Sequence, residues 1–270
     1  MIGDIHHFQV GQLQCANLCD AYNPGDEQLA KNLFPNIATE TVMQAADESG
    51  APFVMCINLL LIRSAGQTIL IDTGLGGESS QLLDMLQKEG VDPADITRVI
   101  ITHCHRDHIG GLVGDDGALT FPNARYSMGQ IEWDYWMGEI DKSDDPQMAQ
   151  RVKLLPIEDH LDIFEPDAEI TPGVCAVFAP GHTVGQMALP LESNGERMLH
   201  MADTAHLAFQ AAHPDWSPTF DKQPDVAAQT RYALFERAAR ENLLLMGYHL
   251  PWPALGHVTM KGDAFSWQPR

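Results

Sequence analysis

One stretch of sequence decides the fold: Thr102-His103-Cys104-His105-Arg106-Asp107-His108-Ile109-Gly110-Gly111. It directly follows a β-branched run at residues 98–102, which predicts a short buried strand. Because alternate residues of a strand point the same way, His103 and His105 can reach one metal ion while Cys104 points away from it. Imidazole side chains in this arrangement are typical ligands of zinc and similar divalent ions.

The same stretch offers donors for a second ion. After His105 the chain must turn, and Asp107 and His108 stand at the mouth of a helix that we expect at residues 107–112. From there both side chains can face a neighbouring ion. Gly110 and Gly111 lack a Cβ, so the backbone can pass close to the site. The stretch therefore predicts the first part of a two-metal site.

Two metal ions need more ligands than this one cluster supplies, so we expect further donors downstream. Three candidates stand just after, or at the end of, predicted strands: His182, Asp203 and His249. Strand ends are rigid positions that can hold a metal ligand in place. Each of the three, taken alone, is an ordinary loop residue. Together with the first cluster they predict a complete ligand set.

The motif His103-x-His105-x-Asp107-His108 resembles the signature of the metallo-β-lactamase superfamily. Supporting segments are in register at residues 70–74, at residues 181–183 and at Asp203. The resemblance covers roughly residues 53–260. Within it, three further stretches resemble the branch that holds methyl parathion hydrolase and the N-acyl homoserine lactonases: residues 121–124, 202–206 and 249–257.

The resemblance implies an α/β fold, a four-layer αβ/βα sandwich of two mixed sheets flanked by helices, formed by residues 1–270 as one domain. It also implies two divalent metal ions at one edge of the sheets. Zn is expected first, and the same ligands accept Mn, Fe or Co. Carried over by position, a first ligand group binds one ion (His103, His105 and His182) and a second ligand group binds the other (Asp107, His108 and His249). Asp203 is expected to bridge both ions.

Two such ions imply a dinuclear metal-dependent hydrolase. A metal-bridging hydroxide would attack while one ion polarises a carbonyl or phosphoryl oxygen, so we expect a small ester, lactone or phosphotriester as substrate. Asp203 and His206 are the expected catalytic residues: Asp203 relays a proton to the leaving group, and His206 contacts the substrate. Lactonases of this branch typically carry Tyr at the position of His206, whereas this chain has His, as members that resemble methyl parathion hydrolase do. This departure argues against lactone specificity, and a buried structural role is the alternative for His206. Asp72 either orients the ligand loops or caps a turn.

Apolar runs and turn residues predict the remaining elements. Strands are expected at residues 53–62, 68–71, 98–102, 124–128, 174–178, 186–191, 197–201 and 243–246. Further helices are expected at residues 80–89, 130–136 and 224–242, with an acidic loop at 141–145. In the last of these helices the spacing predicts a buried face of Ala228, Tyr232, Phe235 and Ala239. No Pro/Gly/Ser-rich linker interrupts the order of strands and helices, which favours one mixed α/β domain.

Aromatic side chains near these segments have two readings. Trp133, Tyr135, Trp136 and Trp252 lie close in sequence to segments that flank the site in relatives. They either form the wall of an apolar substrate pocket or belong to the hydrophobic core.

The composition limits the partners. The 270 residues include 16 Lys and Arg against 37 Asp and Glu, which gives a formal net charge of −21. A surface this acidic repels phosphate backbones and anionic membranes, so we expect neither nucleic acid nor a membrane as a partner. A small-molecule substrate is the expected partner, and relatives of this type suggest a homodimer.

Cysteine content and the N-terminal segment favour a cytoplasmic location. Five cysteines are an odd and sparse set, which predicts reduced thiols in place of a disulfide framework. The segment Met1–Gly11 has no signal-peptide pattern. The longest apolar run, residues 56–62, is far shorter than the roughly 20 residues that span a bilayer.

Other classes of protein share part of the pattern. Glyoxalase II-like thioester hydrolases share the first cluster, but this chain has no basic cluster to hold the carboxylates of glutathione. Iron-dependent sulfur dioxygenase-like enzymes also share it but use one iron, whereas the full ligand set favours two metals. The net charge of −21 disfavours the nuclease branch, and the complete ligand set disfavours a metal-free binding module.

Overall fold

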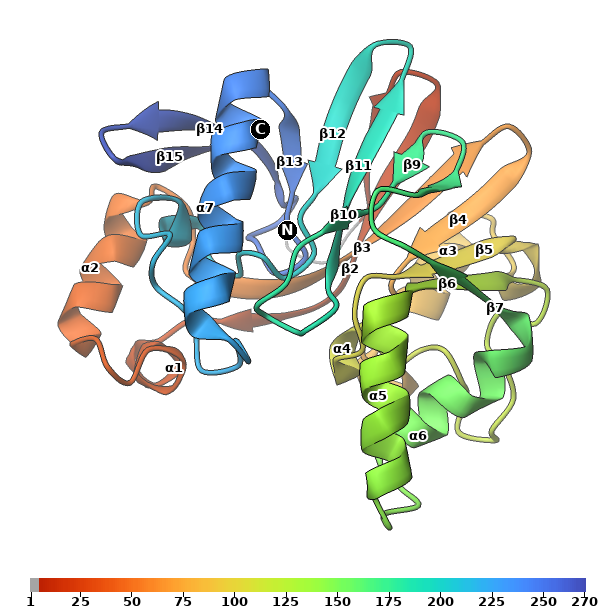
Figure 1. The fold of residues 1–270 in the computed structure, drawn as a ribbon. Helices are drawn as coiled ribbons and strands as arrows, with labels where there is room; N and C mark the ends of the chain where they lie inside the picture. Colours follow the sequence, from red (N-terminus) through yellow and green to blue (C-terminus); the bar gives the residue numbers. More distant parts are fainter. Residues whose placement is uncertain (1–4) are drawn as a thin grey trace.

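The computed structural model describes residues 5–270, in which two β-sheets pack between helices (Figure 1). Residues 1–4, the beginning of the Met1–Gly11 segment, lie outside the described residues. Within residues 5–270, the first sheet contains, side by side in chain order, β1 (Ile5–Val10), β2 (Leu13–Pro24), β3 (Val54–Ser64), β4 (Gln67–Ile71), β5 (Arg98–Ile101), β6 (Arg125–Gly129) and β7 (Leu161–Phe164). Strands β1 to β4 are antiparallel and β4 to β7 are parallel, so this sheet is mixed.

The second sheet has the order β15-β14-β13-β12-β11-β9-β8, with β10 paired to β11. Its strands are β8 (Glu169–Thr171), β9 (Val174–Cys175), β10 (Val177–Phe178), β11 (Met187–Ser193), β12 (Glu196–His200), β13 (Leu244–Met246), β14 (Leu255–Lys261) and β15 (Ala264–Pro269). The pair β12–β13 is parallel and the others are antiparallel, so this sheet is also mixed. The strand predicted at 174–178 is interrupted at Ala176, because its backbone N–H donates to the carbonyl oxygen of Ala168 and its carbonyl oxygen accepts from the N–H of Asp167.

Helices cover the outer faces of both sheets. The helices are α1 (Glu27–Leu33), α2 (Thr39–Glu48), α3 (Leu82–Lys88), α4 (Arg106–Ile109), α5 (Gln130–Lys142), α6 (Ala149–Leu154) and α7 (Pro224–Glu241). Short 3₁₀ helices are η1 (Gly77–Ser79), η2 (Pro93–Asp95), η3 (Leu155–His160) and η4 (Ala208–Ala211). In Figure 1, α7 lies on one side of the paired sheets, and α5 and α6 lie on the other. None of the helices in residues 5–270 is long and apolar enough to cross a membrane.

Three buried clusters define the layers. Between the sheets, Ile62 and Ile69 of the first sheet pack with Leu189 and Met246 of the second. A separate cluster joins the other face of the first sheet to α3 and α5, and a third joins the second sheet to α7. Each fully buried aliphatic side chain contributes about 1.5–3 kcal/mol. The layers are helix, sheet, sheet and helix, which confirms the predicted four-layer α/β fold.

Helix α7 matches its predicted range, but its predicted buried face is wrong. The buried residues of α7 are Ala227, Arg231, Leu234, Phe235 and Ala238, so only Phe235 belongs to both sets. The observed stripe contains a charged residue, and a search for apolar spacing therefore misses it. Helix α5 also continues into the loop predicted at 141–145.

Candidate metal centre

All the expected metal ligands come together at one edge of the two sheets. They lie on the β5–α4 segment (His103, His105, Asp107 and His108), in the β10–β11 loop (His182) and just beyond β12 and β13 (Asp203 and His249). The donor atoms of the first ligand group and of Asp203 all lie within 4.8 Å of one another. The donor atoms of the second ligand group meet the same limit. The structure therefore brings together the side chains of each group that the resemblance implies.

Asp203 lies between the two groups. Its Oδ1 is 3.3 Å from Nε2 of His108, which belongs to the second ligand group. Its Oδ2 is 3.2 Å from Nε2 of His182, in the first group, and 3.0 Å from Nε2 of His249, in the second. One carboxylate thus contacts both groups, as a bridging ligand must.

The chemistry of these residues fits a pair of divalent cations. Among the described residues, His103 Nε2 is buried without a hydrogen-bond partner, and the buried His108 Nε2 and Asp203 Oδ1 face each other at 3.3 Å without hydrogen-bond geometry. Buried polar atoms are nearly always paired, because leaving one unpaired costs roughly 1–3 kcal/mol. Imidazole nitrogens and carboxylate oxygens are zinc ligands, and a cation at the centre of each group would satisfy these atoms.

The electrostatics favour the metal-binding forms of His103, His105 and Asp203. Burial and the neighbouring His108 lower the pKa of His103 well below its usual value. Burial and His182 lower the pKa of His105 to about 3. Burial opposes ionisation of Asp203, but attraction to His249 and His108 outweighs it, so the pKa of Asp203 lies well below its usual value. Neutral imidazole and ionised carboxylate are the forms that bind metal. At His108, His182 and His249 burial opposes protonation, but attraction to Asp203 outweighs it and raises the pKa, to about 10 for His249, so a cation would have to displace a proton from these rings.

Two expectations for residues 102–111 are confirmed. A Cβ on Gly110 would lie 2.0 Å from the carbonyl oxygen of Leu75, and one on Gly111 would lie 2.3 Å from that of Thr73. Both positions therefore require glycine. Cys104 is buried in the core with its Sγ 3.5 Å from Sδ of Met128, so its side chain points away from the ligands.

Asp72 orients His108, one of the expected ligands. Its carboxylate accepts hydrogen bonds from the backbone N–H of Thr102 at 2.8 Å and from the Thr102 hydroxyl at 2.7 Å. Nδ1 of His108 donates to the same carboxylate at 2.8 Å, which leaves Nε2 facing the ligand cluster. Carboxylates that bond to a ligating histidine in this way fix its tautomer and ring orientation. The geometry supports the orienting role for Asp72 over the turn-capping one.

Two further expected ligands, His182 and His249, have orienting partners that no motif indicated. Nδ1 of His182 donates to Asp221 Oδ1 at 2.9 Å, and Nδ1 of His249 donates to the carbonyl oxygen of Cys56 at 2.8 Å. Asp221 in turn accepts a hydrogen bond from the fully buried Arg231 of α7 at 3.0 Å. The burial of Arg231 and its bond to Asp221 could not be predicted from the sequence, because an arginine on a helix is normally expected to be exposed.

His206, the other expected catalytic residue, lies inside the cluster. Its Nε2 is 3.4 Å from Asp203 Oδ2, and its ring stacks on that of His249 with centroids 5.2 Å apart. Burial lowers the pKa of His206 to about 4. Neither ring nitrogen has a hydrogen-bond partner among the described residues. A largely neutral ring with an unused donor and an unused acceptor therefore lies beside Asp203.

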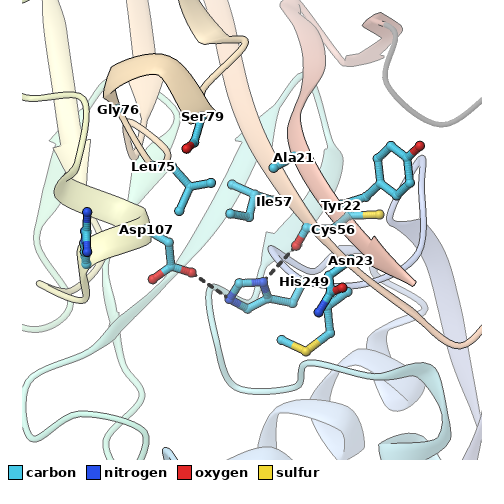
Figure 2. A pocket seen from close by; sticks show the side chains of 12 residues that line it. Ala21, Tyr22, Asn23, Cys56, Ile57, Leu75, Gly76, Ser79, Asp107 and His249 are labelled. Atoms are coloured by element: carbon cyan, nitrogen blue, oxygen red, sulfur yellow. Dashed lines mark hydrogen bonds and ion pairs between the residues drawn. The ribbon is translucent and has the colours of Figure 1, made fainter. Parts of the chain in front are cut away.

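A cavity of about 540 Å³ opens on the second ligand group. Figure 2 shows Asp107 and His249 at its base, with Ile57 and Leu75 above them. The rest of its wall is formed by Ala21, Tyr22, Asn23, Met55, Cys56, Gly76, Ser79 and Arg106. None of the four aromatic residues considered from the sequence lines this cavity, and Trp252 packs against the buried cluster that contains Cys56.

Sequence comparison places the chain among known proteins. Residues 57–262 match the model of the metallo-beta-lactamase superfamily. An uncharacterized protein, YobT, of Bacillus subtilis (strain 168) is 27% identical over 150 residues, which are 53% of this chain and 60% of that protein. The N-acyl homoserine lactonase of Bacillus thuringiensis is 29% identical over 118 residues, 43% of this chain and 41% of the lactonase. The matched segments thus span less than two thirds of these relatives.

Structure comparison extends the similarity over the whole chain. AidC, a dizinc quorum-quenching lactonase, is 27% identical with a TM-score of 0.89, and the match covers 100% of this chain and 98% of AidC. The hydrolase AbOPH, 24% identical, has the same fold with a TM-score of 0.88 over 100% of this chain and 98% of its own. These matches confirm the lactonase side of the expected resemblance, and the methyl parathion hydrolase side stays a prediction. The chain belongs to the metallo-β-lactamase superfamily.

Proposed function

We propose that this chain is a dinuclear metal-dependent hydrolase that opens small lactones and esters. The observation that carries the proposal is the cluster of seven nitrogen and oxygen donors, several of them buried without a partner. A structural role alone does not account for so many unsatisfied buried polar atoms in one place.

In this proposal the first ligand group (His103, His105 and His182) would hold one ion, the second (Asp107, His108 and His249) would hold the other, and Asp203 would be shared between them. Two divalent cations in such a site lower the pKa of bound water toward neutrality and polarise the oxygen of the scissile group. Zinc is the first choice because the donors are imidazole and carboxylate and because AidC is a dizinc enzyme. Mn, Fe and Co suit the same donors.

Three residues have roles other than metal binding in this proposal: Asp203, His206 and Asp72. Asp203 carries a carboxylate that can accept a proton and pass it to the leaving group. His206 would donate a hydrogen bond to the substrate oxygen that gains negative charge, because its ring nitrogens are unengaged and lie beside Asp203. Asp72 keeps His108 in the orientation that directs Nε2 to the cluster.

The cavity above Asp107 and His249 is the proposed substrate site. Ile57 and Leu75 give it an apolar wall, which suits the acyl part of a small ester or lactone. A lactone is the first candidate because AidC, similar over its full length, is a lactonase. Phosphotriesters remain a further candidate class from the sequence resemblance to methyl parathion hydrolase.

A hydrolysis panel on zinc-quantified protein tests the function. The panel contains lactones, aryl esters, phosphotriesters, thioesters and a β-lactam. We expect turnover of a lactone or ester that is lost on chelation and restored by zinc. Turnover of thioesters alone would replace the proposal with a glyoxalase II-like activity. Absence of all metal-dependent hydrolysis would refute the proposal.

A further inference from the structure

Glu132 on α5 is a fully buried carboxylate that belongs to neither ligand group. Its Oε1 accepts hydrogen bonds from the backbone N–H of Cys104 at 3.0 Å and from the indole Nε1–H of Trp136 at 2.8 Å. Its Oε2 accepts from the Thr183 hydroxyl at 2.8 Å and from the backbone N–H of Gly185 at 3.0 Å. Four donors therefore converge on one buried side chain.

Most of these donors come from segments that carry the first ligand group. Cys104 stands between His103 and His105 in the segment that leaves β5 of the first sheet. Thr183 directly follows His182 in the loop that joins β10 to β11 of the second sheet. Glu132 thus connects the ligand segments of the two sheets through a single carboxylate.

The packing around Glu132 leaves little freedom for these segments to separate. A Cβ on Gly185 would lie 2.3 Å from the backbone nitrogen of Glu132, so the β10–β11 loop lies directly against the start of α5. The backbone N–H of Met187 also donates to the carbonyl oxygen of Thr102 at 3.1 Å, which adds a second link between the same two segments.

We propose that Glu132 is a positioning residue for the first ligand group. It fixes the separation of His103 and His105 from His182 and thereby sets the affinity of that group for its metal ion. The inference rests on the proposed function, because it assumes that the group binds a metal. Outer partners of metal ligands typically change metal affinity or activity by about 10–100-fold when they are mutated.

Glu132→Gln is the direct test, because an ionised carboxylate only accepts hydrogen bonds whereas an amide also donates. The variant would set an NH2 group against donors that now bond to one oxygen of Glu132. Asp20→Asn is the matched control. Asp20 is also fully buried and accepts from four donors outside the ligand segments, which are Leu75 N at 3.0 Å, Ser80 Oγ at 2.6 Å, Gln81 N at 2.7 Å and Leu82 N at 2.9 Å.

The measurement is the zinc affinity of metal-stripped protein, by competition with a chromophoric chelator. In Glu132→Gln we expect one of two zinc ions to bind about 10–100-fold more weakly, with the other unchanged. In Asp20→Asn we expect both ions to bind as in the parent. Parental affinity in Glu132→Gln, or equal weakening in both variants, would overturn the inference alone. A parent protein that binds no zinc would overturn both the proposed function and the inference.

If Glu132→Gln does not fold, two less disruptive variants test the positioning role of Glu132. Thr183→Val and Trp136→Phe each remove one donor to Glu132, but only Thr183 lies beside a ligand. We expect Thr183→Val to weaken one zinc ion relative to Trp136→Phe, with thermal unfolding of the metal-free proteins showing that both are folded. Equal zinc affinities in the two folded variants would overturn the inference.

Discussion

Replacing Asp221 with Asn tests whether the buried ion pair behind His182 supports both the fold and the metal site. Asp221 Oδ1 accepts from His182 Nδ1 at 2.9 Å, and Oδ2 accepts from Arg231 Nη2 at 3.0 Å. Asp221 and Arg231 have side chains with 0% exposure. An amide keeps only one acceptor oxygen, so its NH2 group would face a donor on one side or the other.

The expected loss in free energy of unfolding depends on the hydrogen bonds that Arg231 keeps in the variant. Removing one partner of a buried ion pair costs about 3–5 kcal/mol, because the remaining charge is left uncompensated. Arg231 keeps hydrogen bonds to the carbonyl oxygens of Thr204, Pro214 and Trp216, so we expect the lower end, about 3 kcal/mol. At roughly 2–4 °C per kcal/mol for a chain of about this size, the unfolding temperature should fall by about 6–12 °C.

Thermal unfolding of the metal-free parent and variant, followed by circular dichroism, measures this cost. The zinc affinity of the variant should also fall by about 10–100-fold, because His182 loses its orienting partner. Asp162→Asn is the control, since its carboxylate is 43% exposed and its ion pairs with Arg98 and Arg125 should each contribute at most about 1 kcal/mol. An Asp221→Asn protein that unfolds like the parent and binds zinc as tightly would refute the reasoning.

Three further predictions use other parts of the molecule. In metal analysis, His249→Ala should lose the ion of the second ligand group and keep the other. His257→Ala should keep both ions, because His257 lies on β14, outside the donor groups found among the described residues. The reverse pattern would show that His257, and not His249, is the ligand. His206→Ala should keep both ions but slow hydrolysis by roughly tenfold or more. Loss of a fully engaged hydrogen-bond donor typically lowers kcat by about 10²–10³-fold, and we expect a smaller loss here because two metals share the charge. Full activity on every substrate of the parent would show that His206 is structural. The hydrogen bond from Arg125 lowers the pKa of Asp162, so this contact stabilises the fold at pH values above the usual carboxyl pKa, and the stabilisation is lost as the pH falls through the lowered pKa. The free energies of unfolding of Asp162→Asn and the parent should therefore converge as the pH is lowered. A difference in unfolding free energy that grows toward low pH would contradict this.

The ligand cluster could be predicted from the sequence because its chemistry is local. His103 to Gly111 lie in one continuous segment after a β-branched strand, and strand alternation alone gives the direction of Cys104. His182, Asp203 and His249 could also be predicted from the sequence, because each follows a strand that the sequence predicts. The strands of the central core were predicted for the same reason, since their apolar runs end at clear turn residues.

The partners behind the ligands could not be predicted, because they are distant in sequence and lack a motif. Asp221 is 39 residues from His182, and Glu132 is 51 residues from Thr183. Strand β2 was not predicted because most of its first eight residues are buried on both faces, so polar and apolar residues do not alternate along it. Helices α1 and α2 were missed as well, and their packing against Leu207 and Phe209 depends on the tertiary fold.

Metal content tests the central claim most directly. The claim is that the seven donors around Asp203 bind two divalent ions. Protein purified without chelator and analysed by inductively coupled plasma mass spectrometry should contain close to two equivalents of divalent metal per chain, with zinc predominant. Replacing Asp203 with Ala should reduce the content of both sites, because its carboxylate contacts both ligand groups. A parent protein with one equivalent of iron and no other metal would contradict the claim and favour a mononuclear iron enzyme.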